Sequence, residues 1–158
     1  MKTPFRPSIL LLAFGLAVAV HGAEAEVLVA GFDKLASFEF TPPEDPAKAA
    51  AADAQIPEKI REFNDKKVKV TGFMLPVKMS GGLVTEFLLV KDPMMCCYGV
   101  MPKVNEWVVV RMTGKGVPPL MDVPITFEGT LLVGQLYEGG YLTGLYLLKG
   151  DRRIETKG

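Results

Sequence analysis

From Lys67 onward the chain alternates polar and apolar residues, and this period of two restricts the fold more than any other feature of the sequence. The segment from Lys67 to Met74 shows the alternation first, as is typical of a strand with one buried face. Four more candidate strands follow: Val84 to Val90, Glu106 to Met112, Ile125 to Val133 and Tyr141 to Leu148. Alternation is expected to place these residues on one core face: Val68, Val70, Met74, Val109, Phe127 and Tyr146.

Glycines punctuate these strands in two ways. Gly81-Gly82 suits a turn between the first two strands, and Gly139-Gly140 suits a hairpin between the last two. Single glycines inside strands often mark bulges or sharp bends, and they occur here at Gly72, Gly129 and Gly144. The sequence therefore predicts a mainly β fold: a small five-stranded barrel like the oligonucleotide/oligosaccharide-binding (OB) type. An open β-sandwich or meander is the alternative.

The residues before the strands predict one short helix and a docking arm. The helix is expected over Ile56 to Phe63, with Pro57 in its first turn. The arm's apolar anchors are Phe32, Leu35, Phe38 and Phe40. The expected division is a signal peptide at 1–25, an N-terminal arm and Pro/Ala-rich linker at 26–55, a β-barrel domain at 56–150 and a frayed polar tail at 151–158.

The first residues follow the order of a secretory signal peptide. Lys2 and Arg6 are basic, an apolar stretch runs from Ile9 to Val20, and Ala23-Glu24-Ala25 fits a small-x-small cleavage site. The apolar stretch is shorter than the about 20 residues that a spanning helix needs. We therefore expect export to the periplasm, cleavage after Ala25 and no transmembrane segment in the mature chain.

Cleavage there would restrict the chemistry, because it removes His21, the one histidine of the sequence. A chain without imidazole excludes Ser-His-Asp and Cys-His catalysis and the histidine-bearing zinc sites. The sequence also has 18 basic and 18 acidic side chains, a balance that gives no electrostatic basis for binding nucleic acid. We expect neither a nucleic-acid partner nor an enzyme, and we assign no catalytic residue.

Two adjacent cysteines, Cys96 and Cys97, lie in the long connection between the second and third candidate strands. Neighbouring Cα atoms lie about 3.8 Å apart across a trans peptide, whereas ordinary disulfides need about 4.4–6.8 Å. Thiols of an exported protein meet an oxidising compartment. The pair is therefore strained, bound to something soft, protected, or part of the core.

Three interpretations of this connection stay open. Thiolates and thioethers favour Cu(I), and thiolates also favour Zn(II); the soft donors here are Met94, Met95, Cys96, Cys97 and Met101. A strained vicinal disulfide would instead be readily reduced, although the pair lacks the spacing of thioredoxin-like motifs. Buried cysteines could also simply plug the end of the barrel, because buried cysteine behaves as a small hydrophobe.

Neighbouring residues are expected to support the connection. Gly99 suits a positive φ or a close backbone approach, Pro102 stiffens the end of the connection, and Asn105 braces it by hydrogen bonds to backbone. Trp107 begins a strand and is expected in the core rather than as a ligand platform.

Several of these motifs together resemble domain-of-unknown-function family 3299, a family of small exported bacterial proteins. The resemblance covers about Ile56 to Gly134, with a weaker match at Phe32-Asp33-Lys34-Leu35. The segments that carry it are Val70 to Pro76, Glu86 to Val90, Cys96-Cys97-Tyr98-Gly99 with Pro102 and Asn105, and Trp107 to Val110. Asn64-Asp65-Lys66-Lys67 departs from the family's Leu-Asp-Gly-Lys turn.

The resemblance implies a periplasmic protein without assigned chemistry, whose relatives accompany ABC-type transporter components and zinc-responsive exported proteins. We therefore expect an exported accessory protein in Zn(II) or Cu(I) handling, with Cys96 and Cys97 as thiolate ligands and Met94, Met95 and Met101 as helpers. A structural or adaptor module of a transporter assembly is the first alternative, and a thiol/disulfide redox protein is the second.

Export can be tested directly on the expressed protein. We expect the periplasmic form to begin near Glu26, because the basic, apolar and small-residue segments end at Ala25. Intact-mass spectrometry of protein from a periplasmic extract measures this. A periplasmic protein that retains Met1 to Ala25 would contradict the prediction and restore His21 as a ligand.

Overall fold

The alternating segments form long strands in the computed structural model, which describes residues 26–96 and 102–155. The six strands are β1 (Leu28–Val29), β2 (Lys66–Ser80), β3 (Leu83–Val90), β4 (Trp107–Met112), β5 (Ile125–Glu138) and β6 (Tyr141–Ile154). The short helices are α1 (Phe32–Leu35), α2 (Ala49–Ala52) and α3 (Glu58–Arg61), and the 3-10 turns are η1 (Pro46–Lys48), η2 (Asp53–Gln55) and η3 (Pro93–Cys96). None of the helices in these described ranges is long and apolar enough to cross a membrane.

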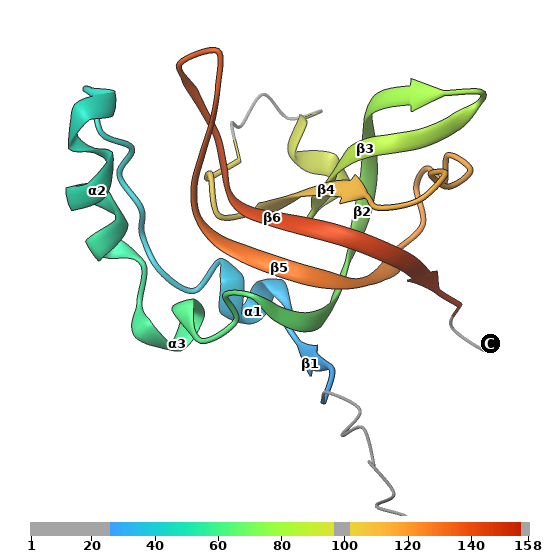
Figure 1. The fold of residues 1–158 in the computed structure, drawn as a ribbon, viewed down its shortest axis with the longest axis horizontal. Coiled ribbons are helices and arrows are strands. Elements are labelled where there is room, and N and C mark those ends of the chain that lie inside the picture. The colour runs from blue at the N-terminus through green and yellow to red at the C-terminus, as the bar shows by residue number, and fades with distance from the viewer. Residues whose placement is uncertain (1–25, 97–101, 156–158) are drawn as a thin grey trace, which may run out of the picture.

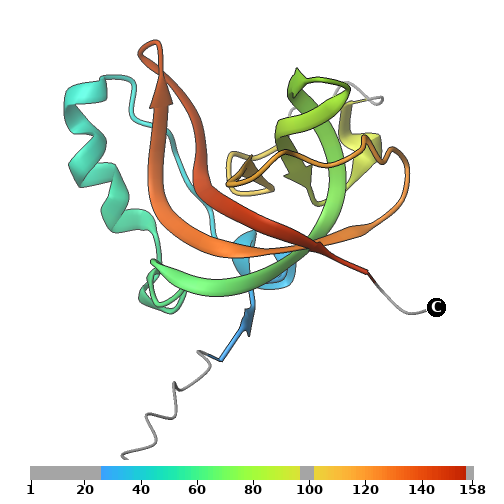
Figure 2. The ribbon, with the colours of Figure 1, turned by 45° about the vertical axis from the view of Figure 1, so that its right-hand side comes forward.

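Five of the strands close into a ring in the order β2-β3-β4-β6-β5, because β5 also pairs with β2 (Figures 1 and 2). The 15-residue strand β2 makes the closure: Lys66 to Gly72 pair with β5, and Phe73 to Ser80 pair with β3. Only the β4–β6 pairing within the ring is parallel. The predicted mainly β fold with five strands is confirmed, and the ring closure excludes the open meander.

Two glycine pairs form the predicted hairpin turns. Gly81 and Gly82 have φ of 58° and 78°, and Gly139 and Gly140 have φ of 58° and 87°. Positive φ at both central residues matches the right-handed twist of the flanking strands. The Asn64-Asp65 turn before β2 is also defined, since Asp65 takes φ 57° and the Asn64 Oδ1 accepts a hydrogen bond from the Val133 N–H at 2.9 Å.

The last strand is longer than predicted, and the boundary of the expected tail is corrected. β6 continues to Ile154, so residues 151–154 are strand rather than frayed tail. Arg152 and Arg153 pair in register with Glu128 and Phe127 of β5. Two adjacent charged residues gave no alternating pattern from which a strand could be predicted. In the structure the Arg152 Nη2 lies 3.1 Å from the Glu128 Oε1, and this cross-strand ion pair stabilises the solvent face of the β5–β6 pair.

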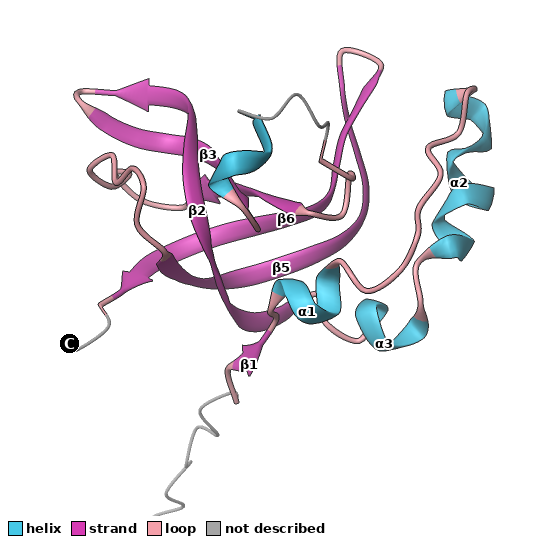
Figure 3. Ribbon diagram, turned by 180° about the vertical axis from the view of Figure 1, so that it is seen from behind, coloured by secondary structure: helices cyan, strands magenta, loops and turns pink. Residues whose placement is uncertain are grey.

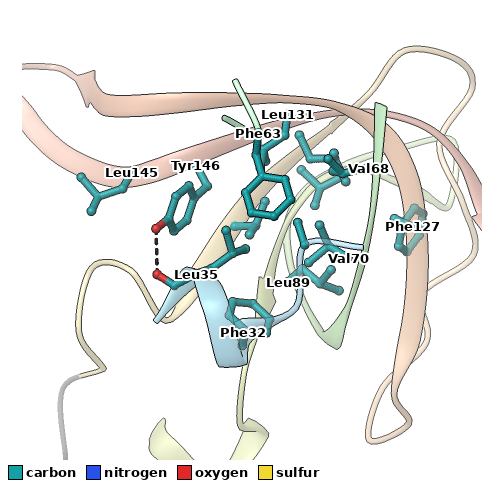
Figure 4. Close-up of a cluster of buried hydrophobic side chains, with 14 of the residues drawn as sticks. Phe32, Leu35, Phe63, Val68, Val70, Leu89, Phe127, Leu131, Leu145 and Tyr146 are labelled. Atoms are coloured by element: carbon teal, nitrogen blue, oxygen red, sulfur yellow. Dashed lines mark hydrogen bonds between the residues drawn. The ribbon is translucent and has the colours of Figure 1, made fainter. Parts of the chain in front are cut away.

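The interior of the ring is one apolar cluster to which the arm also contributes (Figure 4). The expected core residues Val68, Val70, Met74, Phe127 and Tyr146 are all buried in it, as predicted. The residue assigned to the wrong face is Val109: it is buried, but it lines a hollow on the outer face, whereas the core side chains of β4 are Val108 and Val110. The alternation was recognised correctly, and its phase on β4 was wrong.

The N-terminal arm closes one end of the ring (Figure 3). β1 pairs in parallel with β2, and the Phe32 and Leu35 side chains of α1 are buried in the core, so the predicted docking is confirmed. Tyr146 donates its hydroxyl proton to the Leu35 carbonyl at 2.8 Å (Figure 4). Burial raises the pKa of Tyr146 far above its usual range.

The helix prediction before the strands is correct in place, since α3 lies inside the expected 56–63 segment. The Pro/Ala-rich linker is more structured than expected, because it forms η1, α2 and η2. Gln135 on β5 holds it by donating from Nε2 to the Ala49 carbonyl at 2.6 Å and to the Asp53 Oδ1 at 3.0 Å.

Gly129 offers a sharp test of ring closure, because a β-carbon there would collide with the Lys149 carbonyl oxygen of β6. We expect Gly129→Ala to lower the free energy of unfolding by about 3 kcal/mol, since backbone must move to relieve the overlap. Gly114→Ala is the control, because a β-carbon at Gly114 meets no atom within 4 Å. Urea denaturation compares the two, and equal stabilities would contradict this account of the β5–β6 contact.

Candidate functional site

The connection that carries the cysteines starts and ends at a single paired point of the sheet. Val90 at the end of β3 pairs with Trp107 at the start of β4. One step beyond, the Lys91 N–H donates to the Glu106 carbonyl at 3.0 Å. The two ends of the connection are therefore held side by side at its base.

Glu106 ties these two ends with its side chain as well. Its Oε1 lies 3.4 Å from the Lys91 Nζ, and its Oε2 accepts the Lys103 N–H at 3.0 Å. The Glu106 N–H in turn donates to the Lys103 carbonyl at 2.8 Å, which closes a tight turn. The Glu106 side chain is only 13% exposed, so these bonds are partly shielded from water. This role of the Glu106 side chain was not predicted, because the sequence indicated Glu106 only as the first residue of a strand.

The predicted metal ligands lie at the start of this connection or outside the described residues. Asp92 Oδ1 accepts the Met94 N–H at 2.8 Å and so starts η3, whose backbone includes Met95 and Cys96. Met94 is 48% exposed, which places it at the surface and not in the core. The side chains of Met95 and Cys96 are not among those described, and Cys97, Gly99 and Met101 lie outside the described residues.

The described partner of Asn105 is the N-terminal arm, and its predicted role as a brace of the connection stays a prediction. The side chain is fully buried, and Nδ2 donates to the Phe38 carbonyl at 2.7 Å. Among the described residues no group donates to its Oδ1. Next to it, Lys103 Nζ donates to the Glu39 Oε1 at 2.5 Å, and this hydrogen bond and charge raise the pKa of the Lys103 amine.

A hollow of about 360 Å³ lies where the arm meets the end of the connection. Pro102 stands in its wall, next to Lys103. The remaining lining is apolar and comes from the arm, from the end of the connection, from β4 and from β6: Phe40, Pro42, Val104, Trp107 and Leu142. Trp107 contacts the core on one side, as predicted, and it borders this hollow on the other. Its indole N–H donates to the Thr143 carbonyl at 2.9 Å, which fixes the orientation of the indole.

A second hollow, of about 300 Å³, lies on the outer face of β3 and β4. The charged side chains that line it are Glu86 and Glu138. Both bond the neighbouring Arg111, and Lys78 Nζ lies 3.0 Å from the Glu86 Oε2. Burial acts to raise the pKa of Glu86, but the hydrogen bonds from Lys78 and Arg111 outweigh it, so the pKa is lowered. These charges neutralise one another and select no class of ligand.

Within residues 26–96 and 102–155, no group of three or more His, Cys, Asp or Glu side chains is placed to hold a metal ion. The candidate site stays the cysteine connection because of the soft donors in its sequence, and the structure describes the frame on either side of it.

The chain is similar to known proteins over most of its length. A family model described as "Protein of unknown function (DUF3299)" matches residues 33–151. The crystal structure of a DUF3299 family protein from Pseudomonas aeruginosa PAO1 is similar, with a TM-score of 0.59 and 25% identity, over 84% of this chain and 99% of that one. Among curated proteins, none matches this sequence.

The Glu86 cluster predicts a pH dependence of stability. Because the pKa of Glu86 is lower in the folded protein than its usual 4.5, ionised Glu86 stabilises the fold above about pH 4.5, and this contribution is lost as the pH falls through the folded-state value. We expect Glu86→Gln to lower the free energy of unfolding by about 1 kcal/mol at pH 7, and by nothing at pH 2.

The matched control is Glu138→Gln, which removes the other carboxylate on Arg111. The Glu138 side chain is 48% exposed, so its loss should cost less than about 0.5 kcal/mol. Urea denaturation at pH 2 and pH 7 measures both variants. A Glu86→Gln penalty that does not change between these pH values would contradict the assignment.

Proposed function

The chain belongs to the DUF3299 family, and within it we propose that this protein is an exported accessory protein that binds Zn(II) or Cu(I) through Cys96 and Cys97. The observation that carries the proposal is the density of soft donors in one framed connection. Two thiols and three thioethers fall between Met94 and Met101. Thiolates and thioethers together are the donor set that suits Cu(I), and thiolates also suit Zn(II).

The frame described above supports this proposal, because a binding connection gains affinity when its ends are held before the ligand arrives. Glu106 bonds Lys91 at one end and Lys103 at the other. Asp92 orders the start of η3 through the Met94 N–H. The exposure of Met94 leaves a thioether at the surface, where an arriving ion could meet it.

Export is part of the proposal, and it sharpens the choice of ligands. Cleavage after Ala25 would remove His21 and leave β1, which begins at Leu28, in place. The mature chain would then offer thiolates, thioethers and carboxylates but no imidazole. Because cysteine thiols must lose their protons to bind a metal ion, the metal affinity should fall as the pH is lowered.

Transfer to an inner-membrane transporter is the role that we propose for such a site, with ABC-type components as partners. The alternatives differ in what the cysteines do. An adaptor module would bury them for stability, and a redox protein would cycle them between thiols and a disulfide. Metal affinity and stability, measured together on the same variants, separate these functions.

The decisive variant is the double replacement Cys96→Ser/Cys97→Ser. We expect the reduced wild type to bind about one equivalent of Cu(I) or Zn(II), and the variant to lose affinity by about 100-fold or more, because hydroxyls are poor ligands for soft ions. Its Tm should stay within about 3 °C of the wild type. Competition with chromophoric chelators and thermal denaturation provide the two measurements.

A methionine pair gives the matched control. Met94 and Met121 are 48% and 50% exposed, and only Met94 lies in the connection. Met94→Leu should weaken Cu(I) binding, whereas Met121→Leu should not. Unchanged metal affinity in the double-serine variant, together with a large fall in Tm, would reject metal binding and favour buried structural cysteines.

A further inference from the structure

The hollow of about 300 Å³ on the outer face of β3 and β4, which we call the outer hollow, has an apolar floor. Leu88 and Val109 pair across the two strands there, and Val77 of β2 also lines the hollow. Two residues further along the same face, Val90 pairs with Trp107, which lines the hollow as well. The outer hollow therefore combines aliphatic side chains with one aromatic side chain.

Two carboxylates line the outer hollow away from Trp107, and each keeps one oxygen available. The Glu86 side chain is only 10% exposed, and its Oε2 accepts both Lys78 Nζ and Arg111 Nε at 3.0 Å. Glu138 in turn accepts Arg111 Nη2 through its Oε1. Among the described residues no donor bonds the Glu86 Oε1 or the Glu138 Oε2. These two oxygens can accept hydrogen bonds from a ligand.

The balance of charge favours a neutral ligand. Two carboxylates, one guanidinium and one ammonium group cancel, so an ion of either sign gains nothing from their sum. The lining can instead satisfy a molecule that has both hydroxyl groups and an apolar face. Hydroxyls donate to carboxylate oxygens and accept from guanidinium N–H groups, while C–H groups pack on the aliphatic floor and the indole. A sugar ring has both features, and a volume of about 300 Å³, at the lower end for small-molecule sites, suits a single sugar unit.

The outer hollow also lies where this fold can present a ligand site. The β2–β3 and β5–β6 hairpins project on the same side of the ring (Figures 1 and 3). Val77 of the first hairpin, and Glu138 and Thr143 of the second, line the hollow. In OB-type folds, oligosaccharides and oligonucleotides bind on the face of the second and third strands between two such loops. Fold position does not choose between these ligands, but the carboxylates in the lining would repel phosphodiesters.

We propose that the outer hollow binds one unit of a neutral oligosaccharide. The apolar face of the sugar packs against Trp107 and the Leu88–Val109 pair, and its hydroxyls donate to Glu86 and Glu138. This site goes beyond the proposed metal function, because none of the residues that line the outer hollow in the described structure lies between Met94 and Met101.

The fluorescence of Trp107 tests the proposal, because it is the one tryptophan of the chain. Its indole is held by the Thr143 carbonyl beside the hollow, so an arriving ligand changes its surroundings. The full chain is titrated with maltotetraose, cellotetraose and chitotetraose, each to about 10 mM. We expect a saturable change in fluorescence with at least one of these sugars and none with a 12-residue oligothymidylate.

Two variants with matched controls locate the binding. Glu138→Ala removes an acceptor at the surface and should weaken sugar affinity by about tenfold. Its control is Glu155→Ala, because Glu155 is also exposed and paired with an arginine, but lies outside the hollow. Val77→Phe reduces the space in the hollow and should weaken affinity by a similar factor. Its control is Val29→Phe, at an exposed position of β1. Both controls should bind within about twofold of wild type.

Trp107 also lines the hollow of about 360 Å³ beside the arm, so a third control is needed. Lys103→Gln alters that hollow alone and should leave sugar affinity unchanged. If it weakens binding while Glu138→Ala does not, the sugar occupies the other hollow and the proposal is wrong. Circular dichroism checks folding, and if Glu138→Ala is unfolded, Val77→Phe decides.

The remaining outcomes are equally clear. No saturable change with any of the three sugars refutes the proposal, and so does binding of the oligothymidylate in their place. Wild-type affinity in both Glu138→Ala and Val77→Phe refutes it too. The Cys96→Ser/Cys97→Ser variant should bind the sugar as tightly as wild type, so a failure of metal binding leaves this proposal standing, and the reverse also holds.

Discussion

The closure of the ring depends on one strand having two partners. β2 pairs with β5 up to Gly72 and with β3 from Phe73 onward, so the strand must bend sharply where it changes partners. Glycine suits that point, because a β-carbon at Gly72 would lie 2.7 Å from the Val90 carbonyl oxygen. Once β2 bends, the apolar faces of the five strands enclose a single core, and the β3–β4 connection is placed at the rim.

A short ring leaves its ends open, and the arm covers one of them. Phe32 and Leu35 of α1 complete the core from below, and the buried Tyr146 hydroxyl finds its acceptor on the Leu35 backbone. The same arm continues to the end of the β3–β4 connection, where Asn105 Nδ2 donates to the Phe38 carbonyl. One segment therefore contributes both to the stability of the fold and to the frame of the cysteine connection.

The candidate site illustrates what sequence reasoning can and cannot reach. The cysteines and methionines attract attention because their chemistry is local and visible in the chain. The hydrogen-bond partner of Asn105, the Phe38 carbonyl, lies 67 positions away in the sequence, and no pattern near either residue predicts the contact. Glu106 was missed for a related reason, since a carboxylate beside a strand acquires its role only when Lys91 and Lys103 are folded back against it. Val109 was placed on the wrong face because the burial of a uniformly apolar strand does not reveal its phase.

The sequence by itself determined the mainly β class, the number of strands in the ring, both glycine hairpins and the docking of the arm. These follow from short-range physics: the two-residue period of side chains, the backbone freedom of paired glycines, and the need to bury phenylalanine and leucine side chains. Tertiary structure alone decided the closing β2–β5 pair, the parallel β4–β6 pair, the extension of β6 through Arg152 and Arg153, and the ties at Glu106 and Asn105. Each of these depends on hydrogen bonds or charges between distant segments, which exist only after the chain has folded.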